Sequence, residues 1–284
     1  MNGIINIYKP LGITSHGVVN KVRRILNMKK VGHTGTLDPD AEGVLPICVG
    51  KGTKIAGLLT DTDKAYRAVI KLGVVTDTQD ASGKILIEND VNISNKEFEN
   101  AVNQFIGKIM QTPPMYSALK VGGRKLCDLA RQGIEVERKP REITINSIKI
   151  SNFNGITATL DVDCTKGTYI RTLCHDIGQH LACGAIMQSL TRTKSGRFLI
   201  DDSVTLEEFE KSPLNYIISP DVLFCDLPEY IANNEETKII KNGGKIPVII
   251  PDGQKYRVYS DNGEFLSISV SEKGKLVLQT VFFT

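Results

Sequence analysis

The sequence has no apolar stretch long enough to cross a membrane. A transmembrane helix needs about 18 or more consecutive apolar residues, and every hydrophobic run in these 284 residues is shorter. The N-terminus also lacks the charged and then apolar segments that mark a secretory signal. We therefore expect no contact with a membrane and a cytoplasmic location.

The six cysteines are scattered and include no Cys-x-x-Cys pair. We do not expect a disulfide framework in a cytoplasmic chain of this size. Cys174, His175, His180 and Cys183 lie close together in the sequence. However, histidines five residues apart do not share a helix face, and the spacing matches no common zinc motif. We expect neither a metal ion nor a cofactor.

Acidic residues are absent from the first 37 residues, which contain six Lys or Arg residues. The first carboxylate, Asp38, lies in a segment over residues 32–43 that contains three glycines and Pro39, a composition that predicts irregular backbone. Asp before Pro is a common turn signal, although loops on a rigid scaffold also carry many catalytic side chains. The net charge of +3 is too small to indicate a nucleic-acid partner by itself.

Apolar periodicity predicts a mixture of strands and helices over the first 210 residues. Strands are expected at residues 4–8, 66–72, 143–150, 156–164 and 190–198. Helices are expected to begin after Ser15, Thr53, Ser94, Thr168 and Thr205, with Gly107 closing the third of them. Between them, residues 111–131 contain Pro113-Pro114 and Gly122-Gly123, which predict a loop-rich excursion.

The composition changes after Pro228. Short β-type runs at residues 246–250, 256–259, 265–270 and 275–283 are separated by turns that contain glycine. We therefore expect two domains, one over residues 1–228 and a small β-barrel-like module over residues 229–284.

Several segments occur in the order typical of one enzyme family. They are Lys9-Pro-Leu-Gly-Ile-Thr-Ser, residues 32–50, Lys64-Ala-Tyr-Arg-Ala-Val, Met115-Tyr-Ser-Ala-Leu-Lys, Arg131-Gln-Gly-Ile-Glu-Val and Lys166-Gly-Thr-Tyr-Ile-Arg-Thr-Leu. Over roughly residues 1–210 the chain resembles the pseudouridine synthases of the TruB type. The resemblance implies an α+β catalytic domain with an antiparallel or mixed sheet and an RNA-binding cleft, followed by a PUA-like RNA-binding module.

The resemblance also implies an activity. Such an enzyme isomerises uridine to pseudouridine at position 55 in the TΨC loop of transfer RNA, without a protein partner. The base is flipped out, the glycosidic bond is broken, and the detached uracil is rejoined through C5; a carboxylate can assist this without a cofactor. Two alternatives stay open, a synthase that depends on a guide RNA and a chaperone that folds transfer RNA without required catalysis.

By the same resemblance, Asp38 is the essential aspartate, Arg171 pairs with it, and Tyr66 stacks on the target uracil. Whether Asp38 attacks the sugar, adds to the base or removes the C2′ proton stays open, and we favour proton removal with a glycal intermediate. Further RNA contacts are expected from His33, Tyr169, Leu190, Lys9, Lys120, Arg124 and Lys125. The last three lie in an expected RNA-gripping insertion over residues 111–140.

Overall fold

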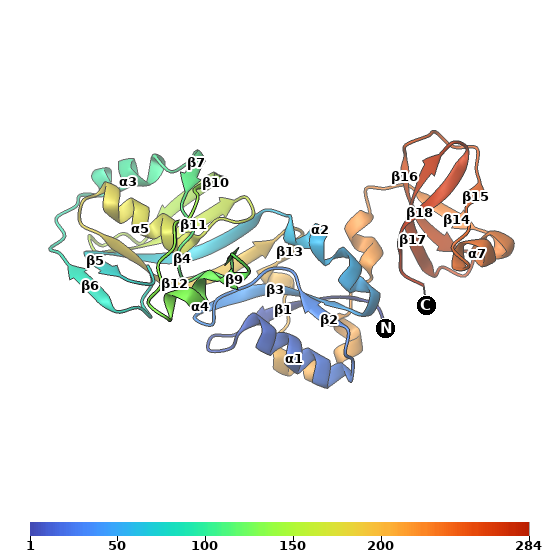
Figure 1. The fold of residues 1–284 in the computed structure, drawn as a ribbon, viewed down its shortest axis with the longest axis horizontal. Coiled ribbons are helices and arrows are strands. Elements are labelled where there is room, and N and C mark those ends of the chain that lie inside the picture. The colour runs from blue at the N-terminus through green and yellow to red at the C-terminus, as the bar shows by residue number, and fades with distance from the viewer. Residues whose placement is uncertain (284) are drawn as a thin grey trace.

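The computed structural model describes residues 1–283, which form two separate main sheets (Figure 1). The larger sheet follows the order β1-β3-β12-β4-β11-β10-β7, with β2 added to β3 and β13 added to β12. Its strands are β1 (Gly3–Lys9), β2 (Val31–His33), β3 (Ala41–Val49), β4 (Lys64–Leu72), β7 (Gly107–Gln111), β10 (Arg141–Ser151), β11 (Thr157–Cys164), β12 (Ala185–Ser195) and β13 (Phe198–Leu199). Because β3 and β12 run parallel and the other pairs antiparallel, the mixed sheet and the α+β class are confirmed.

Apolar side chains alternate along the strands, so one face of the sheet is apolar and is covered by helices. In β11, Ala158, Leu160, Val162 and Cys164 are buried at every second position, as expected for side chains with a period of two. Helix α5 (Ile170–His180) packs on β4 and β12, and α3 (Asn95–Asn103) contacts α5 and β10. Near the other end of the sheet, α1 (Ser15–Leu26) and α6 (Leu206–Lys211) pack beside β2 and β1.

The capping residues of two helices were predicted correctly. Ser94 and Thr205 each accept a hydrogen bond from the third residue of the helix, where Glu97 and Glu208 complete a capping box. The prediction that Ser15 caps α1 is wrong, because the hydroxyl of Thr14 accepts from the backbone N–H of Gly17 and Ser15 is the first helical residue. Ser15 is left free to contact another segment.

Three other local predictions need correction. Thr53 is not a cap, since it lies inside the 3₁₀ segment Gly50–Ile55, which leads into α2 (Ala56–Thr60). Helix α3 ends at Asn103, and Gly107 instead begins β7. The strand expected at residues 190–198 begins earlier, at Ala185.

The chain after Pro228 forms a curled sheet in the order β14-β16-β17-β18-β15. Its elements are β14 (Glu229–Ala232), α7 (Asn234–Lys241), β15 (Ile246–Pro247), β16 (Lys255–Ser260), β17 (Phe265–Glu272) and β18 (Lys275–Val281). The expected small β module is therefore present, although the sequence did not predict β14 or α7. Residue 284, its expected end, lies outside the described residues, and the boundary at residue 228 stays a prediction.

The C-terminal module packs against the larger body through an apolar contact. Ile268 and Phe282 share one buried cluster with Ile4, Ile55 and Phe198. The Nζ of Lys54 also donates to the carbonyl of Val281 at 2.9 Å. None of the helices in residues 1–283 has the length and apolar character of a membrane span.

The remaining elements are short. They are the hairpin β5 (Val74–Thr76) and β6 (Ile85–Glu88), the hairpin β8 (Lys120–Val121) and β9 (Arg124–Lys125), helix α4 (Leu126–Ala130), and the 3₁₀ turns Ile200–Asp202, Pro213–Tyr216 and Pro220–Phe224. The first hairpin and the segment that contains β8, β9 and α4 both contribute residues to the site described next.

Candidate active site

Asp38 lies in the loop between β2 and β3, which we call the Asp38 loop (residues 34–40). Ser15, at the start of α1, holds this loop by its backbone: its Oγ donates to the carbonyl of Leu37 at 3.0 Å and accepts from the N–H of Leu37 at 2.8 Å. These contacts do not use the Asp38 carboxylate. The loop is therefore anchored independently of the charge that it carries.

Lys9 also holds the loop, which corrects its expected role as an RNA contact. Its side chain is fully buried, and Nζ donates to the carbonyls of Pro10 at 2.9 Å, Ile13 at 2.7 Å and Pro39 at 3.3 Å. Burial lowers the pKa of Lys9 to about 8. An ammonium whose donors all face backbone carbonyls serves the local fold rather than a phosphate.

Arg171, in the first turn of α5, connects the Asp38 loop to two other segments. Its Nη2 lies 2.9 Å from Oδ2 of Asp38 and donates to the carbonyl of Tyr116 at 2.8 Å. Its Nη1 lies 3.3 Å from Oδ2 of Asp80 and donates to the carbonyl of Thr78 at 3.2 Å. The side chain is only 7% exposed, so these partners set the orientation of the guanidinium.

Asp80 is a site residue that the sequence did not indicate. It lies in the turn between β5 and β6, where its Oδ1 accepts hydrogen bonds from the hydroxyl of Thr78 at 2.7 Å and from the N–H of Ser82 at 3.0 Å. In the sequence this segment has only the composition of an ordinary polar turn. In the folded protein this turn places a second carboxylate, fixed by these hydrogen bonds, beside the guanidinium of Arg171.

The surroundings of Asp38 have opposing effects on its charge. Burial raises the pKa of the Asp38 carboxyl, the neighbouring Arg171 lowers it, and Asp80 and Asp40 raise it. The net direction is upward. The side chain remains 44% exposed, so a bound molecule that covered it would increase the effect of burial and make the contact with Arg171 more important.

A cavity of about 710 Å³ opens beside this pair. Its lining includes six of the residues expected at the site, namely Asp38, Arg171, Tyr66, His33, Tyr169 and Leu190. They come from the Asp38 loop, β2, β4, the segment before α5, α5 itself and β12. The fold therefore gathers into one cavity residues that are up to 157 positions apart in sequence, from His33 to Leu190.

Arg192 and Lys64 line the same cavity and were also missed from the sequence. Arg192 is 1% exposed; its Nε donates to the carbonyl of Val44 at 2.7 Å, and its two Nη atoms donate to the carbonyls of Thr36 and Gly35 at 3.4 Å. Burial lowers the pKa of Lys64 to about 8, and its Nζ donates to the carbonyl of Thr60 at 2.6 Å. Lys64 precedes Tyr66 by two residues on β4, and Arg192 lies opposite Tyr66 on β12, so two buried positive charges lie near this tyrosine.

Gly43 permits the close approach of β3 to β12 at this point. Its φ is +103°, and a Cβ there would lie 2.3 Å from the carbonyl oxygen of Arg192. Any other residue would push the parallel strands apart. The position of Arg192 under the Asp38 loop thus depends on this glycine.

Tyr169 is held by a side-chain amide. The N–H of Tyr169 donates to Oε1 of Gln111 at 2.8 Å, and Nε2 of Gln111 donates back to the Tyr169 carbonyl at 3.1 Å. Gln111 ends β7 and is almost fully buried. This two-point contact fixes the backbone just before Arg171.

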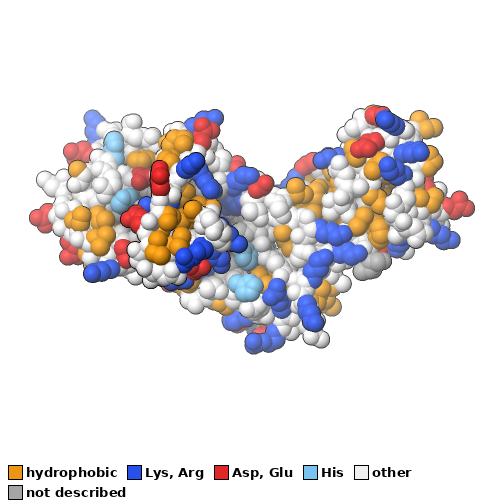
Figure 2. All heavy atoms as spheres, in the orientation of Figure 1, with side chains coloured by type: hydrophobic (Ala, Val, Ile, Leu, Met, Phe, Trp, Pro, Cys, Tyr) orange, Lys and Arg blue, Asp and Glu red, His pale blue; other side chains and the backbone are white. Residues whose placement is uncertain are grey.

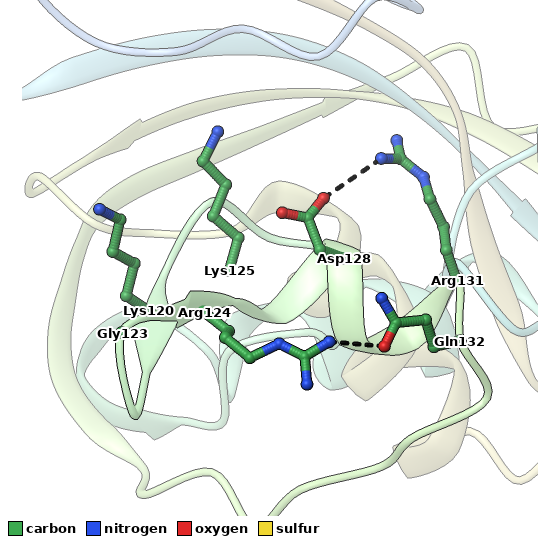
Figure 3. A pocket seen from close by; sticks show the side chains of 7 residues that line it. All are labelled: Lys120, Gly123, Arg124, Lys125, Asp128, Arg131 and Gln132. Atoms are coloured by element: carbon green, nitrogen blue, oxygen red, sulfur yellow. Dashed lines mark hydrogen bonds and ion pairs between the residues drawn. The ribbon is translucent and has the colours of Figure 1, made fainter.

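The other expected RNA contacts lie outside the Asp38 cavity. Lys120, Arg124 and Lys125 line a second cavity of about 610 Å³, on β8 and β9 next to α4 (Figure 3). There Arg124 donates to Oε1 of Gln132 at 2.5 Å, and Arg131 pairs with Asp128 at 3.5 Å. Met115, Leu126 and Leu129 form a small apolar cluster within this segment, separate from the main core.

Histidine, cysteine and acidic side chains do not gather into a metal-binding group. Within residues 1–283, no three of them come close enough together to hold a metal ion. All six cysteines are free thiols in this part of the chain.

Comparisons with known proteins point to one family. A model described as the TruB family pseudouridylate synthase N-terminal domain matches residues 23–170, and one described as the tRNA pseudouridylate synthase B C-terminal domain matches residues 171–220. The chain is 47% identical to the tRNA pseudouridine synthase B of Clostridium acetobutylicum over 286 residues, covering 98% of this chain and 99% of the relative. It is 49% identical to that of Clostridioides difficile over 254 residues, covering 87% and 84%.

Solved structures show the same fold. A chain in the crystal structure of a Cbf5-Nop10-Gar1 complex superposes with a TM-score of 0.71 at 27% identity, covering 99% of this chain and 85% of that one. A chain of the archaeal box H/ACA sRNP Nop10-Cbf5 complex gives 0.68 at 25% identity, covering 99% and 86%.

Proposed function

Because the chain belongs to the TruB family of pseudouridylate synthases, we propose that it carries out its reaction in the Asp38 cavity. The chain is a pseudouridine synthase that acts on transfer RNA, an activity that follows from the family and from relatives named tRNA pseudouridine synthase B. The observation that supports the location is the contact of 2.9 Å between Arg171 and Asp38 at a cavity that Tyr66 also lines. Paired acid and base groups in a concave site are typical of catalysis.

The proposed substrate position is uridine 55 in the TΨC loop. A uridine inside a folded loop is reached only if it is flipped out, at a cost of a few kcal/mol. Stacking of a base on an aromatic ring returns about 1 to 3 kcal/mol, which we assign to Tyr66. A cavity of about 710 Å³ offers room for a flipped nucleoside, with Tyr169 and Leu190 along its walls.

Asp38 acts as a base in the proposed mechanism. It removes the C2′ proton, the bond between C1′ and N1 breaks, and the detached uracil rotates so that C5 can bond to C1′. As this bond forms, Asp38 returns the proton to C2′; the C5 proton is then lost and N1 gains one, so the product is an isomer of the substrate. Attack of Asp38 on the sugar or addition to the base are the two alternatives. In each case Arg171 favours the ionised form of Asp38 and orients it.

His33 is proposed to contact the RNA beside the flipped nucleotide. Burial lowers the pKa of its imidazole, and its Nδ1 accepts a hydrogen bond from the N–H of Gly35 at 3.3 Å. A neutral ring at the edge of the cavity can stack on or hydrogen-bond to a base without requiring a counter-charge.

Lys120, Arg124 and Lys125 are proposed to grip the RNA backbone. They lie on the segment whose Tyr116 carbonyl contacts Arg171, so RNA held there would lie next to the Asp38 cavity. Figure 2 shows Lys and Arg side chains gathered around the hollow between the larger body and the C-terminal module. We propose that residues 1–228 catalyse and that residues 229–284 add binding surface.

Changing all three basic residues to glutamine should weaken binding more than chemistry. Each lost phosphate contact removes about 0.9 from the slope of log K against log salt, so the slope should become shallower by roughly 2 to 3. The single-turnover rate at saturating enzyme should stay within a few-fold of wild type. Binding measured across a salt series tests this, with Lys96→Gln on the exposed face of α3 as the control. An unchanged affinity and slope would remove these residues from the RNA contact.

The enzyme is proposed to act alone in the cytoplasm, without a guide RNA or a protein partner. Relatives at 47–49% identity carry the name tRNA pseudouridine synthase B, whereas the Cbf5 complexes are more distant, at 25–27%. Purified protein and an unmodified transfer-RNA transcript should suffice for pseudouridine at position 55. A transcript with cytidine at that position is the control. Product that appears only after a guide RNA is added would contradict the proposal.

A further inference from the structure

Arg192 has a buried charge that no carboxylate neutralises at ion-pair distance among residues 1–283. Its hydrogen-bond acceptors in the Asp38 loop and β3 are the carbonyls of Gly35, Thr36 and Val44. Burial of an ion without a counter-ion is costly, and a neutral donor could bond to carbonyls at less cost. We therefore look for a group near Arg192 that its positive charge can stabilise.

Tyr66 is the group beside Arg192 on which negative charge can develop. The two residues are opposite each other in the register of β4 and β12, and both line the Asp38 cavity. Side chains directly opposite each other in paired strands project from the same face of the sheet, so the guanidinium and the phenol are neighbours. Burial raises the pKa of the Tyr66 phenol, and Arg192 is the strongest influence that lowers it.

We propose that Arg192 is a positioning residue that stabilises the phenolate of Tyr66 while Tyr66 moves a proton from C5 to N1 of the uracil. In this step the phenol gives its proton to N1 of the detached uracil anion, and the phenolate then takes the C5 proton after the bond between C1′ and C5 has formed. Tyr66 ends in its starting state. The inference rests on the proposed function of the Asp38 cavity.

The two buried arginines of the cavity thereby serve different groups. Arg171 contacts the Asp38 carboxylate, which works on the sugar, and Arg192 lies opposite Tyr66, whose phenol works on the base. Arg192 also bonds to the Asp38 loop, so its loss could slow the reaction for a purely structural reason. The experiment must separate these two effects.

An isotope effect at C5 separates them. Arg192→Gln is expected to lower the single-turnover rate on the order of 10²-fold, the usual size of an acid–base contribution. With transfer RNA deuterated at C5 of the target uridine, the variant should show a larger isotope effect than wild type, because removal of the C5 proton becomes slow. A residue that only held the loop would slow the earlier cleavage and leave the isotope effect at or below the wild-type value. That result would overturn the proposal.

A double-mutant cycle covers the case in which Arg192→Gln does not fold. Arg192→Lys keeps a buried positive charge, and we expect it to slow the wild-type enzyme about tenfold but the Tyr66→Phe enzyme by no more than about twofold. If Arg192→Lys lowers the rate by the same factor in the wild-type and Tyr66→Phe enzymes, Arg192 does not act through Tyr66. Absence of product from wild-type enzyme would instead refute the proposed function, and the inference with it.

Discussion

Replacement of Asp38 by asparagine is expected to abolish pseudouridine formation, with a loss of at least about 10² to 10⁴ in single-turnover rate. Asparagine keeps the shape of the side chain but has neither its charge nor its basicity. Affinity for transfer RNA should stay within a few-fold of wild type, because Ser15 and Lys9 hold the loop through the backbone of Leu37 and Pro39. Mapping of pseudouridine in a treated transcript and a binding titration measure the two quantities.

Asp40→Asn is the matched control, because Asp40 is exposed on the same loop and its replacement by asparagine removes the same negative charge. It should keep nearly the full rate. Substantial turnover by a verified Asp38→Asn enzyme would show that another group performs the proposed proton removal. The variant also tests the chaperone alternative: if it still folds transfer RNA, folding does not require catalysis, and the two roles coexist in one chain.

Arg171→Lys is expected to cause the second large loss. The guanidinium contacts the Asp38 loop, the segment around Tyr116 and the turn that carries Asp80, and a lysine ammonium cannot span this set of partners. Because Asp38 is 44% exposed, the loss of its partner is partly offset by solvent, and we expect a rate loss on the order of 10²-fold, at the lower end of acid–base contributions.

The pH dependence of this variant gives a second reading. Arg171 lowers the pKa of Asp38 and thereby opposes the upward effect of burial. If lysine interacts less well, the pKa of Asp38 rises further and the carboxylate forms only at higher pH. The acid side of the single-turnover profile should therefore move to higher pH. Arg67→Lys, at an exposed pair with Asp161, is the control and should change neither rate nor profile. A near-normal rate for Arg171→Lys would remove Arg171 from the site.

Local features of this protein were determined by the sequence itself. The alternation of residues 156–164 predicted β11, and Ser94 and Thr205 predicted two helix starts, because period and capping depend on neighbours within a few residues. The order of the motifs indicated the family, and the resemblance to that family indicated Asp38 as the expected catalytic aspartate. The β runs after Pro228 predicted a second sheet for the same reason, as each run is a local pattern.

Only the tertiary structure decided which of these side chains meet. From the sequence, the positive charge of Lys9 suggested an RNA contact, but its side chain is buried and donates to backbone carbonyls. A long lysine side chain on β1 can reach either the surface or the interior, and the packing of distant segments selects between the two. Asp80 faces Arg171 from the β5–β6 turn, and Arg192 reaches Tyr66 through strand register. These contacts join residues far apart along the chain, whereas sequence periodicity reports only which face of its own element a residue occupies.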